Sequence, residues 1–147
     1  MSGGVLLSVG TDEGRAQVIL RLAAAWATLL ALYIYADFLS LYRPGELEEI
    51  SGGGFGPFEV SQATLLVASL IVMVPAAMIL LSVLLPHGVN RRVNLILAVI
   101  YTLVNIANLV GEGWAYYIMF GIAEIAVTIF IFITAWRWAP TRTGGVR

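Results

Sequence analysis

Residues 114–138 read WAYYIMFGIAEIAVTIFIFITAWRW, and Glu124 and Arg137 are the only charged side chains in this stretch. An α-helix rises about 1.5 Å per residue and needs about 20 residues to cross the roughly 30 Å hydrocarbon core of a bilayer. Three other apolar stretches occupy residues 18–42, 61–85 and 92–110. The sequence therefore predicts four membrane-spanning helices.

Composition and connection lengths predict a single all-α membrane domain over residues 1–147. The chain is 60% hydrophobic and 12% charged, whereas about 25% of residues are charged in a typical soluble protein. The second and third connections are so short that consecutive helices must be antiparallel neighbours, which predicts an up-and-down four-helix bundle. In the longer connection, residues 43–60, we expect a short surface helix over Pro44–Ile50 and no regular structure over residues 51–57.

The arginines predict the orientation in the membrane. If the N-terminus is cytoplasmic, only Arg43 of the eight arginines falls outside, and cytoplasmic segments are the ones that normally carry the excess of basic residues. The first apolar stretch is longer than that of a signal peptide, so we expect it to remain as a helix. We therefore expect a multi-pass protein of a bacterial inner (cell) membrane with both termini in the cytoplasm.

Several classes of site are not supported by the sequence. Cysteine is absent, which excludes disulfides and thiolate metal sites. His87 is the only histidine, and its place in a connection beside Pro86 predicts a solvated side chain rather than a metal ligand. The net charge of −1 offers no basic surface for nucleic acid. We predict no metal site, and no motif assigns a cofactor.

Two carboxylic acids lie inside the predicted helices, where charge is unfavourable. A charged side chain at the centre of a membrane-spanning helix costs about 2.5–3.5 kcal/mol on insertion scales. Glu124 lies about ten residues, or roughly 15 Å, into the fourth helix, whereas Asp37 lies only about five residues from the end of the first. Asp37 could therefore reach the interface, whereas we expect the Glu124 carboxyl group to face the bundle interior as a protonated acid or a hydrogen-bonded carboxylate.

Polar residues of the third helix follow the helical repeat. Steps of seven, four, three and four residues separate Asn94, Tyr101, Asn105, Asn108 and Glu112. Such steps place side chains on one face of an α-helix. The same reasoning places Tyr33 beside Asp37 and Tyr117 beside Glu124.

We predict that these faces converge on a polar site in the outer half of the bundle, open to the outside and closed by an apolar inner half. The candidate ligand-binding or proton-linked residues are Asp37, Glu124, Asn105, Asn108, Tyr33, Tyr101 and Tyr117. No catalytic residue is assigned.

Two further features predict local packing. Pro75 cannot donate a hydrogen bond to the carbonyl of Ile71, which predicts a kink in the second helix. Ala23, Ala27 and Ala31 recur every four residues, which favours close packing either within the bundle or between protomers.

Three functions are compatible with this pattern. In the first, the protein binds or moves a small ligand or ion at the polar site. In the second, the polar residues only hold helices together, and the protein is an accessory or scaffold subunit of a membrane complex. In the third and least favoured, it is a membrane-embedded enzyme acting on a lipid or isoprenoid, with Glu124 and Asp37 as acid and base. The bilayer is the expected partner, and homo-oligomerisation or membership of a larger complex stays open.

Four motifs resemble an uncharacterised family of small bacterial four-span membrane proteins. They are Tyr35–Leu41 followed by Pro44-Gly45, Pro75–Met78, Asn90–Asn94 and Tyr117–Glu124. This resemblance implies a four-span fold and no particular activity. A weaker architectural similarity to DoxX-like proteins implies a small-ligand, quinone or redox-partner context.

Overall fold

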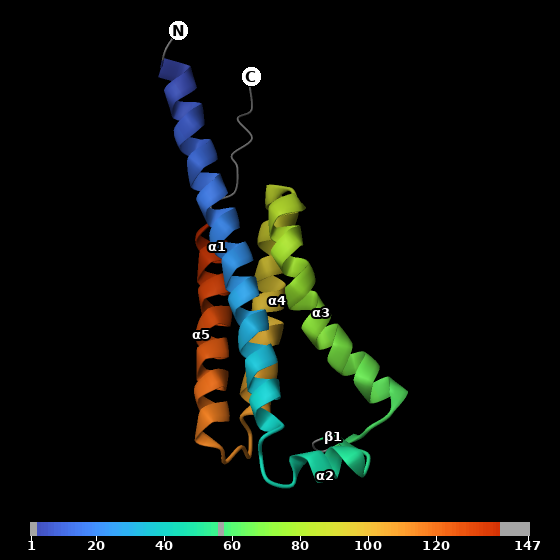
Figure 1. Ribbon diagram of the computed structural model, residues 1–147. Helices are drawn as coiled ribbons and strands as arrows, with labels where there is room; N and C mark the ends of the chain where they lie inside the picture. The colour runs from blue at the N-terminus through green and yellow to red at the C-terminus, as the bar shows by residue number, and fades with distance from the viewer. Residues whose placement is uncertain (1–2, 56–57, 139–147) are drawn as a thin grey trace.

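The computed structural model describes residues 3–55 and 58–138, and it is built from four long helices (Figure 1). They are α1 (Gly3–Ser40), α3 (Gln62–Leu84), α4 (His87–Asn108) and α5 (Ala115–Arg137). Each contains a segment long and apolar enough to cross a membrane. The predicted all-α, four-span membrane bundle is therefore confirmed.

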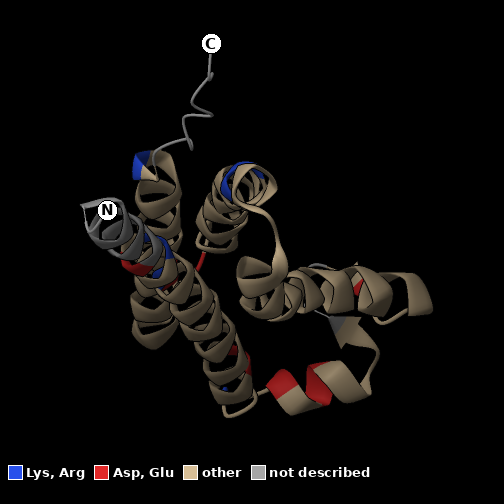
Figure 2. Cartoon of the chain, turned by 90° about the horizontal axis from the view of Figure 1, so that it is seen from above, with Lys and Arg blue, Asp and Glu red and all other residues tan. Residues whose placement is uncertain are grey.

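The helices form a bundle in which α1 packs against both α3 and α5, and α4 packs against α5. We call the end that holds residues 41–61 and 109–114 the α2 end, and the end where α3 meets α4 the terminal end. All five acidic side chains outside the long helices lie at the α2 end, and those of α2 are red in Figure 2, whereas Arg91, Arg92 and Arg137 lie at the terminal end. Large apolar side chains are exposed along all four helices, which suits lipid as the surrounding solvent.

The apolar core lies in the half of the bundle near the terminal end. Leu22, Trp26 and Leu29 of α1 are fully buried there, against Met78 of α3 and Ile131 of α5. The Trp26 ring meets the Tyr101 ring edge to face, with centroids 5.7 Å apart.

In contrast, α3 leaves the bundle toward the α2 end. Its buried residues are Pro75, Met78 and Ser82, and none of its residues before Pro75 is buried. Figure 1 shows this first half of α3 diverging from the other helices. The α2 end of the bundle is therefore more open than the terminal end.

The connection between α1 and α3 differs in part from expectation. The predicted surface helix is present as α2 (Glu46–Ser51). The expectation that residues 51–57 lack regular structure was wrong, because β1 (Gly54–Phe55) pairs with β2 (Phe58–Glu59) as a short antiparallel ladder. Gly53 has φ +91°, a conformation that glycine adopts without strain, and its carbonyl accepts a hydrogen bond from Val60 N at 2.7 Å.

The carbonyl left free by Pro75 has a partner on another helix. Proline has no N–H, so the Ile71 carbonyl cannot receive its normal bond from position 75. The Tyr101 hydroxyl of α4 donates to this carbonyl at 2.7 Å. A backbone group that would be costly to leave unpaired in lipid is thereby satisfied.

The same arrangement recurs where α3 ends. Pro86 cannot donate to the Ser82 carbonyl, four residues earlier. Asn90 Nδ2, also on α4, donates to it at 2.6 Å.

Side chains of α4 also bond backbone carbonyls at the end of α5. Arg91 Nη2 donates to the Trp136 carbonyl at 3.3 Å, and its Nε donates to the Ala135 carbonyl at 3.1 Å. Donors on α4 thus satisfy backbone carbonyls of both α3 and α5.

Replacing Tyr101 with phenylalanine is expected to lower the free energy of unfolding by about 1–3 kcal/mol, because the Ile71 carbonyl would lose its partner. In a Pro75→Ala background the N–H of residue 75 can bond this carbonyl, so the same Tyr101→Phe change should cost less than about 0.5 kcal/mol. The measurement is SDS-induced unfolding in mixed micelles of the four proteins of this double-mutant cycle. An equal loss of stability from Tyr101→Phe in both backgrounds would contradict the role of Tyr101 as the partner of the Ile71 carbonyl.

Candidate intramembrane site

The polar stripe predicted on α4 lies mostly in the bundle interior. Asn94, Tyr101 and Asn105 are buried, and so is Asn90 one turn earlier. Asn108 is exposed, because it is the last residue of α4 and lies at the end of the bundle from which α3 diverges. Asn108 is therefore not brought into the interior with the other candidates.

Several of these polar groups already serve the fold. Tyr101 uses its hydroxyl hydrogen on the Ile71 carbonyl. Asn94 accepts a hydrogen bond from Trp26 Nε1 at 2.7 Å and donates to Asn90 Oδ1 at 2.7 Å. The half of the bundle that was expected to be mostly apolar and closed by apolar packing thus also holds a buried hydrogen-bond network. In this network Asn90 donates a hydrogen bond to the Ser82 carbonyl near the end of α3, and Asn94 accepts one from the Trp26 indole of α1.

One amide group is left without a partner. The Tyr33 hydroxyl donates to Asn105 Oδ1, so these two predicted residues do meet. Asn105 Nδ2 is buried and has no hydrogen-bond partner within residues 3–55 and 58–138. Tyr33 also lies within electrostatic range of Asp37 and Glu124. The interior therefore contains an unused hydrogen-bond donor near two acids.

Glu124 is buried on α5 and unpaired. Its side chain is 5% exposed, and it forms no hydrogen bond or ion pair with any described residue. One turn earlier, a Cβ atom at Gly121 would lie 2.5 Å from Leu109 Cδ2, so the missing side chain allows the end of α4 to pack closely on α5. One turn later, Thr128 is fully bonded, to Thr102 at 2.8 Å and to the Ile125 carbonyl.

Asp37 lies one turn beyond Tyr33 on the same face of α1. Its side chain is exposed at the α2 end, where the divergence of α3 leaves this face uncovered. Its charge lies within range of Glu124 and of Tyr117, which is half-buried on α5. Two acids and two tyrosine hydroxyls from α1 and α5 thus lie near one another.

The arginine nearest to these acids is already neutralised. Arg43 forms an ion pair with Glu112 at 3.0 Å, the only ion pair among the described residues, and its Nε donates to the Tyr116 hydroxyl at 2.7 Å. Its guanidinium also lies over the rings of Trp114, Tyr116 and Tyr117, at 5.0–5.5 Å from their centroids. This Arg43 cluster fixes the end of α1 to the α4–α5 turn. The sequence analysis placed Glu112 at the end of the polar stripe of the third helix and did not pair it with Arg43.

The Arg43 cluster predicts a dependence of stability on acid. Burial alone would raise the pKa of Glu112, but hydrogen bonds from the N–H groups of Trp114 and Gly113 and the Arg43 charge outweigh it and lower the pKa below its ordinary value of 4.5. The stabilisation that the ionised Glu112 carboxylate gives the folded protein is fully present above pH 4.5. It is lost as the pH falls through the lowered pKa of the folded state. The melting temperature, measured by thermal unfolding, should therefore fall more steeply between pH 6 and 3 for the wild type than for Glu112→Gln. Parallel curves would contradict the prediction.

The histidine at the terminal end is not solvated as expected. His87 is buried, and its ring meets that of Trp138 edge to face at 4.5 Å. Both ring nitrogens, and the hydroxyl of buried Ser82, have no hydrogen-bond partner. The sequence did not reveal this burial, because Trp138 comes from the far end of the chain.

Buried Glu124 and exposed Asp37 define a small acidic site. Asp37 and Glu124 have no cationic partner among the described residues, and Asn105 Nδ2 and the Tyr117 hydroxyl are not used by the fold. No group of three His, Asp or Glu side chains is gathered within the part of the chain that the structure describes. The arrangement suits a ligand that donates hydrogen bonds or carries positive charge.

Comparison with known proteins places the chain in a family. Residues 9–143 match the family of unknown function DUF6326. No curated protein and no solved structure matches the chain, so the architectural similarity to DoxX-like proteins gains no support. Because the match covers nearly the whole sequence, the chain belongs to the family of unknown function DUF6326, whose fold here is a four-helix membrane bundle.

Proposed function

We propose that this protein binds a small cation, either an inorganic ion or a protonated amine, at Asp37 and Glu124. The observation that carries the proposal is Glu124, a residue that is only 5% exposed and whose carboxyl group has no partner among the described residues. Buried polar groups are normally hydrogen-bonded, and ionisable groups within membrane helices usually mark functional sites. A bound cation would supply the missing partner.

The surrounding groups support a ligand rather than a purely structural role. Asn90, Asn94, Tyr101 and Thr128 each have a partner that the fold requires. Glu124 and Asn105 Nδ2 have none. An ammonium group, or a water molecule of a hydrated ion, could donate to Glu124, and the oxygen of a water molecule bound with the cation could accept from Asn105 Nδ2.

Access is proposed from outside the cell membrane. The arginine distribution favours a cytoplasmic terminal end and therefore an external α2 end. Asp37 is exposed at that end, beside the helix that diverges. The acidic side chains of α2, namely Glu46, Glu48 and Glu49, would raise the local concentration of cations.

A scaffold role is the second candidate, and one observation favours it. Asn90, Tyr101 and Arg91 satisfy backbone carbonyls of α3 and α5, which shows that much of the polar content of the bundle serves the fold. In a scaffold, the two acids would tolerate replacement by their amides without loss of any ligand response.

The test is thermal unfolding of the purified protein in Na⁺, K⁺, methylammonium and tetramethylammonium chlorides at equal ionic strength. At least one cation should raise the melting temperature, because a ligand that binds only the folded state stabilises it. Glu124→Gln and Asp37→Asn should abolish this difference. Glu59→Gln, which removes an exposed acid at the same end, should retain it. The same response to all four salts in the wild type, or a retained response in Glu124→Gln, would reject cation binding.

A further inference from the structure

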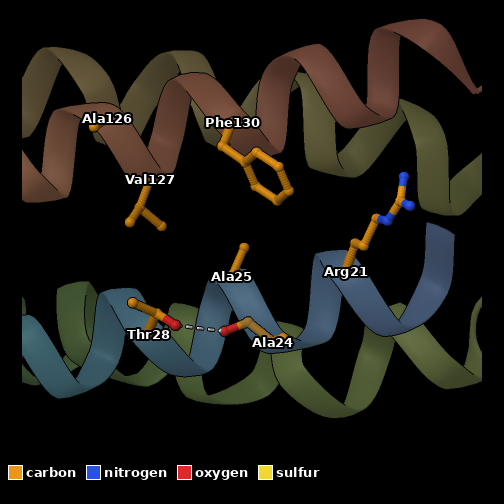
Figure 3. Close-up of a pocket in the computed structure, with 7 residues that line it drawn as sticks. All are labelled: Arg21, Ala24, Ala25, Thr28, Ala126, Val127 and Phe130. Atoms are coloured by element: carbon orange, nitrogen blue, oxygen red, sulfur yellow. Dashed lines mark hydrogen bonds between the residues drawn. The ribbon is translucent and has the colours of Figure 1, made fainter. Parts of the chain in front are cut away.

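A groove lies between α1 and α5 in the half of the bundle nearer the terminal end. Its volume is about 410 Å³. It is hollow because small side chains line it from both helices, with Ala24 and Ala25 on α1 and Ala126 on α5. Ala24 and Ala126 are exposed, so the groove opens toward the surrounding lipid. Figure 3 shows the two helices facing each other across this space.

The walls of the groove are apolar. Phe130 of α5 projects toward α1 (Figure 3). The Thr28 hydroxyl donates to the Ala24 carbonyl at 2.9 Å, so it offers no free hydrogen to a ligand. Such a surface fits a hydrocarbon chain rather than a polar molecule.

One end of the groove carries a free positive charge. Arg21 lines the groove and is exposed, and it makes no ion pair with a described residue. It lies 19 residues before the end of α1 at Ser40, which corresponds to about 28 Å along the helix. That distance places its guanidinium near the opposite boundary of a roughly 30 Å hydrocarbon core, at the same end as Arg91 and Arg137.

We propose that this groove binds an anionic phospholipid of the cytoplasmic leaflet, with its phosphate on Arg21 and one acyl chain along the alanines. The charge and the apolar walls are complementary to the two parts of such a lipid. Guanidinium pairs well with phosphate, and anionic lipids are attracted to basic residues at the cytoplasmic surface. The proposal is independent of the Asp37 and Glu124 site, which lies nearer the α2 end.

The test is native mass spectrometry of the detergent-solubilised protein titrated with phosphatidylglycerol or phosphatidylcholine. The wild type should bind one phosphatidylglycerol more tightly than phosphatidylcholine. Arg21→Gln should weaken phosphatidylglycerol binding about fivefold, which is the effect of one basic residue at a membrane surface, and leave phosphatidylcholine binding nearly unchanged. Arg92→Gln removes an exposed arginine at the same end but outside the groove, and should have no such effect.

A second variant tests whether the alanine-lined part of the groove binds the acyl chain of the lipid. Ala24→Leu with Ala126→Leu fills the groove from both exposed sides, and should reduce the binding of both lipids without changing the melting temperature in detergent. Equal losses in Arg21→Gln and Arg92→Gln would show only general charge attraction and would overturn the site. Unchanged lipid binding in the double variant would also overturn it. If instead the double variant converts a dimer to a monomer, the groove holds a second copy of the chain and the lipid proposal is wrong.

Discussion

Replacing Glu124 with glutamine is expected to raise the free energy of unfolding of the ligand-free protein by about 1 kcal/mol or more. Glu124 is a residue only 5% exposed, its carboxyl group has no partner among the described residues, and a charged side chain at this depth is costly by about 2.5–3.5 kcal/mol on insertion scales. The neutral amide has nearly the same shape and avoids the cost of charge. A gain in stability together with a loss of cation response is the behaviour of a functional residue that the fold does not need.

The measurement is SDS-induced unfolding in mixed micelles without added ligand cation. Thr128→Val is the matched control, because Thr128 is buried on the same face of α5 and bonded to Thr102. It should lose stability and keep the cation response. A purely structural Glu124 would instead lose stability on replacement, as an interhelical hydrogen bond contributes about 0.6 kcal/mol on average in a membrane protein.

Replacing Trp26 with alanine is expected to lower the free energy of unfolding by about 3–5 kcal/mol, the range for large aromatic side chains removed from a core. Trp26 is fully buried and packs on the Tyr101 ring, and its indole donates to Asn94. The change removes the ring and also leaves Asn94 Oδ1 without its donor. The size of the effect follows from both losses.

Trp136→Ala is the matched control, because this tryptophan is 62% exposed on α5. It should change the free energy of unfolding by no more than about 0.5 kcal/mol. Trp26→Phe should fall between the two, since it keeps an aromatic ring but loses the N–H. Equal effects of Trp26→Ala and Trp136→Ala would show that the tryptophan does not support the bundle in the way its burial indicates.

The four helices were predictable because bilayer thickness imposes a length and a composition that the sequence displays directly. The face of α4 was also predictable, since Asn94, Tyr101 and Asn105 follow the helical repeat. The burial of His87 and the exposure of Asn108 were not. Both depend on how far neighbouring helices extend and diverge, and hydropathy carries no such information.

The division between structural and unused polar residues was also hidden in the sequence. The structural role of these polar residues can be recognised by asking which backbone carbonyls lie four residues before Pro75 and Pro86 and therefore receive no N–H from those positions. This pairing of proline and carbonyl identifies the Ile71 and Ser82 carbonyls as groups that need a donor, but only the relative placement of the helices shows that α4 provides it. The candidate site is what remains after these donors are assigned.

The donors on α4 have a consequence for how the chain enters the bilayer. As each helix leaves the translocon, α3 would carry the unpaired Ile71 and Ser82 carbonyls into lipid, and each such group costs several kcal/mol there. Alone, α4 would carry Asn90 Nδ2 and the Tyr101 hydroxyl as donors without these acceptors, and it is the least apolar of the four helices. Each helix supplies what the other lacks. The two should therefore partition into the membrane together as one hairpin, and a nascent chain that stops after α3 should insert poorly.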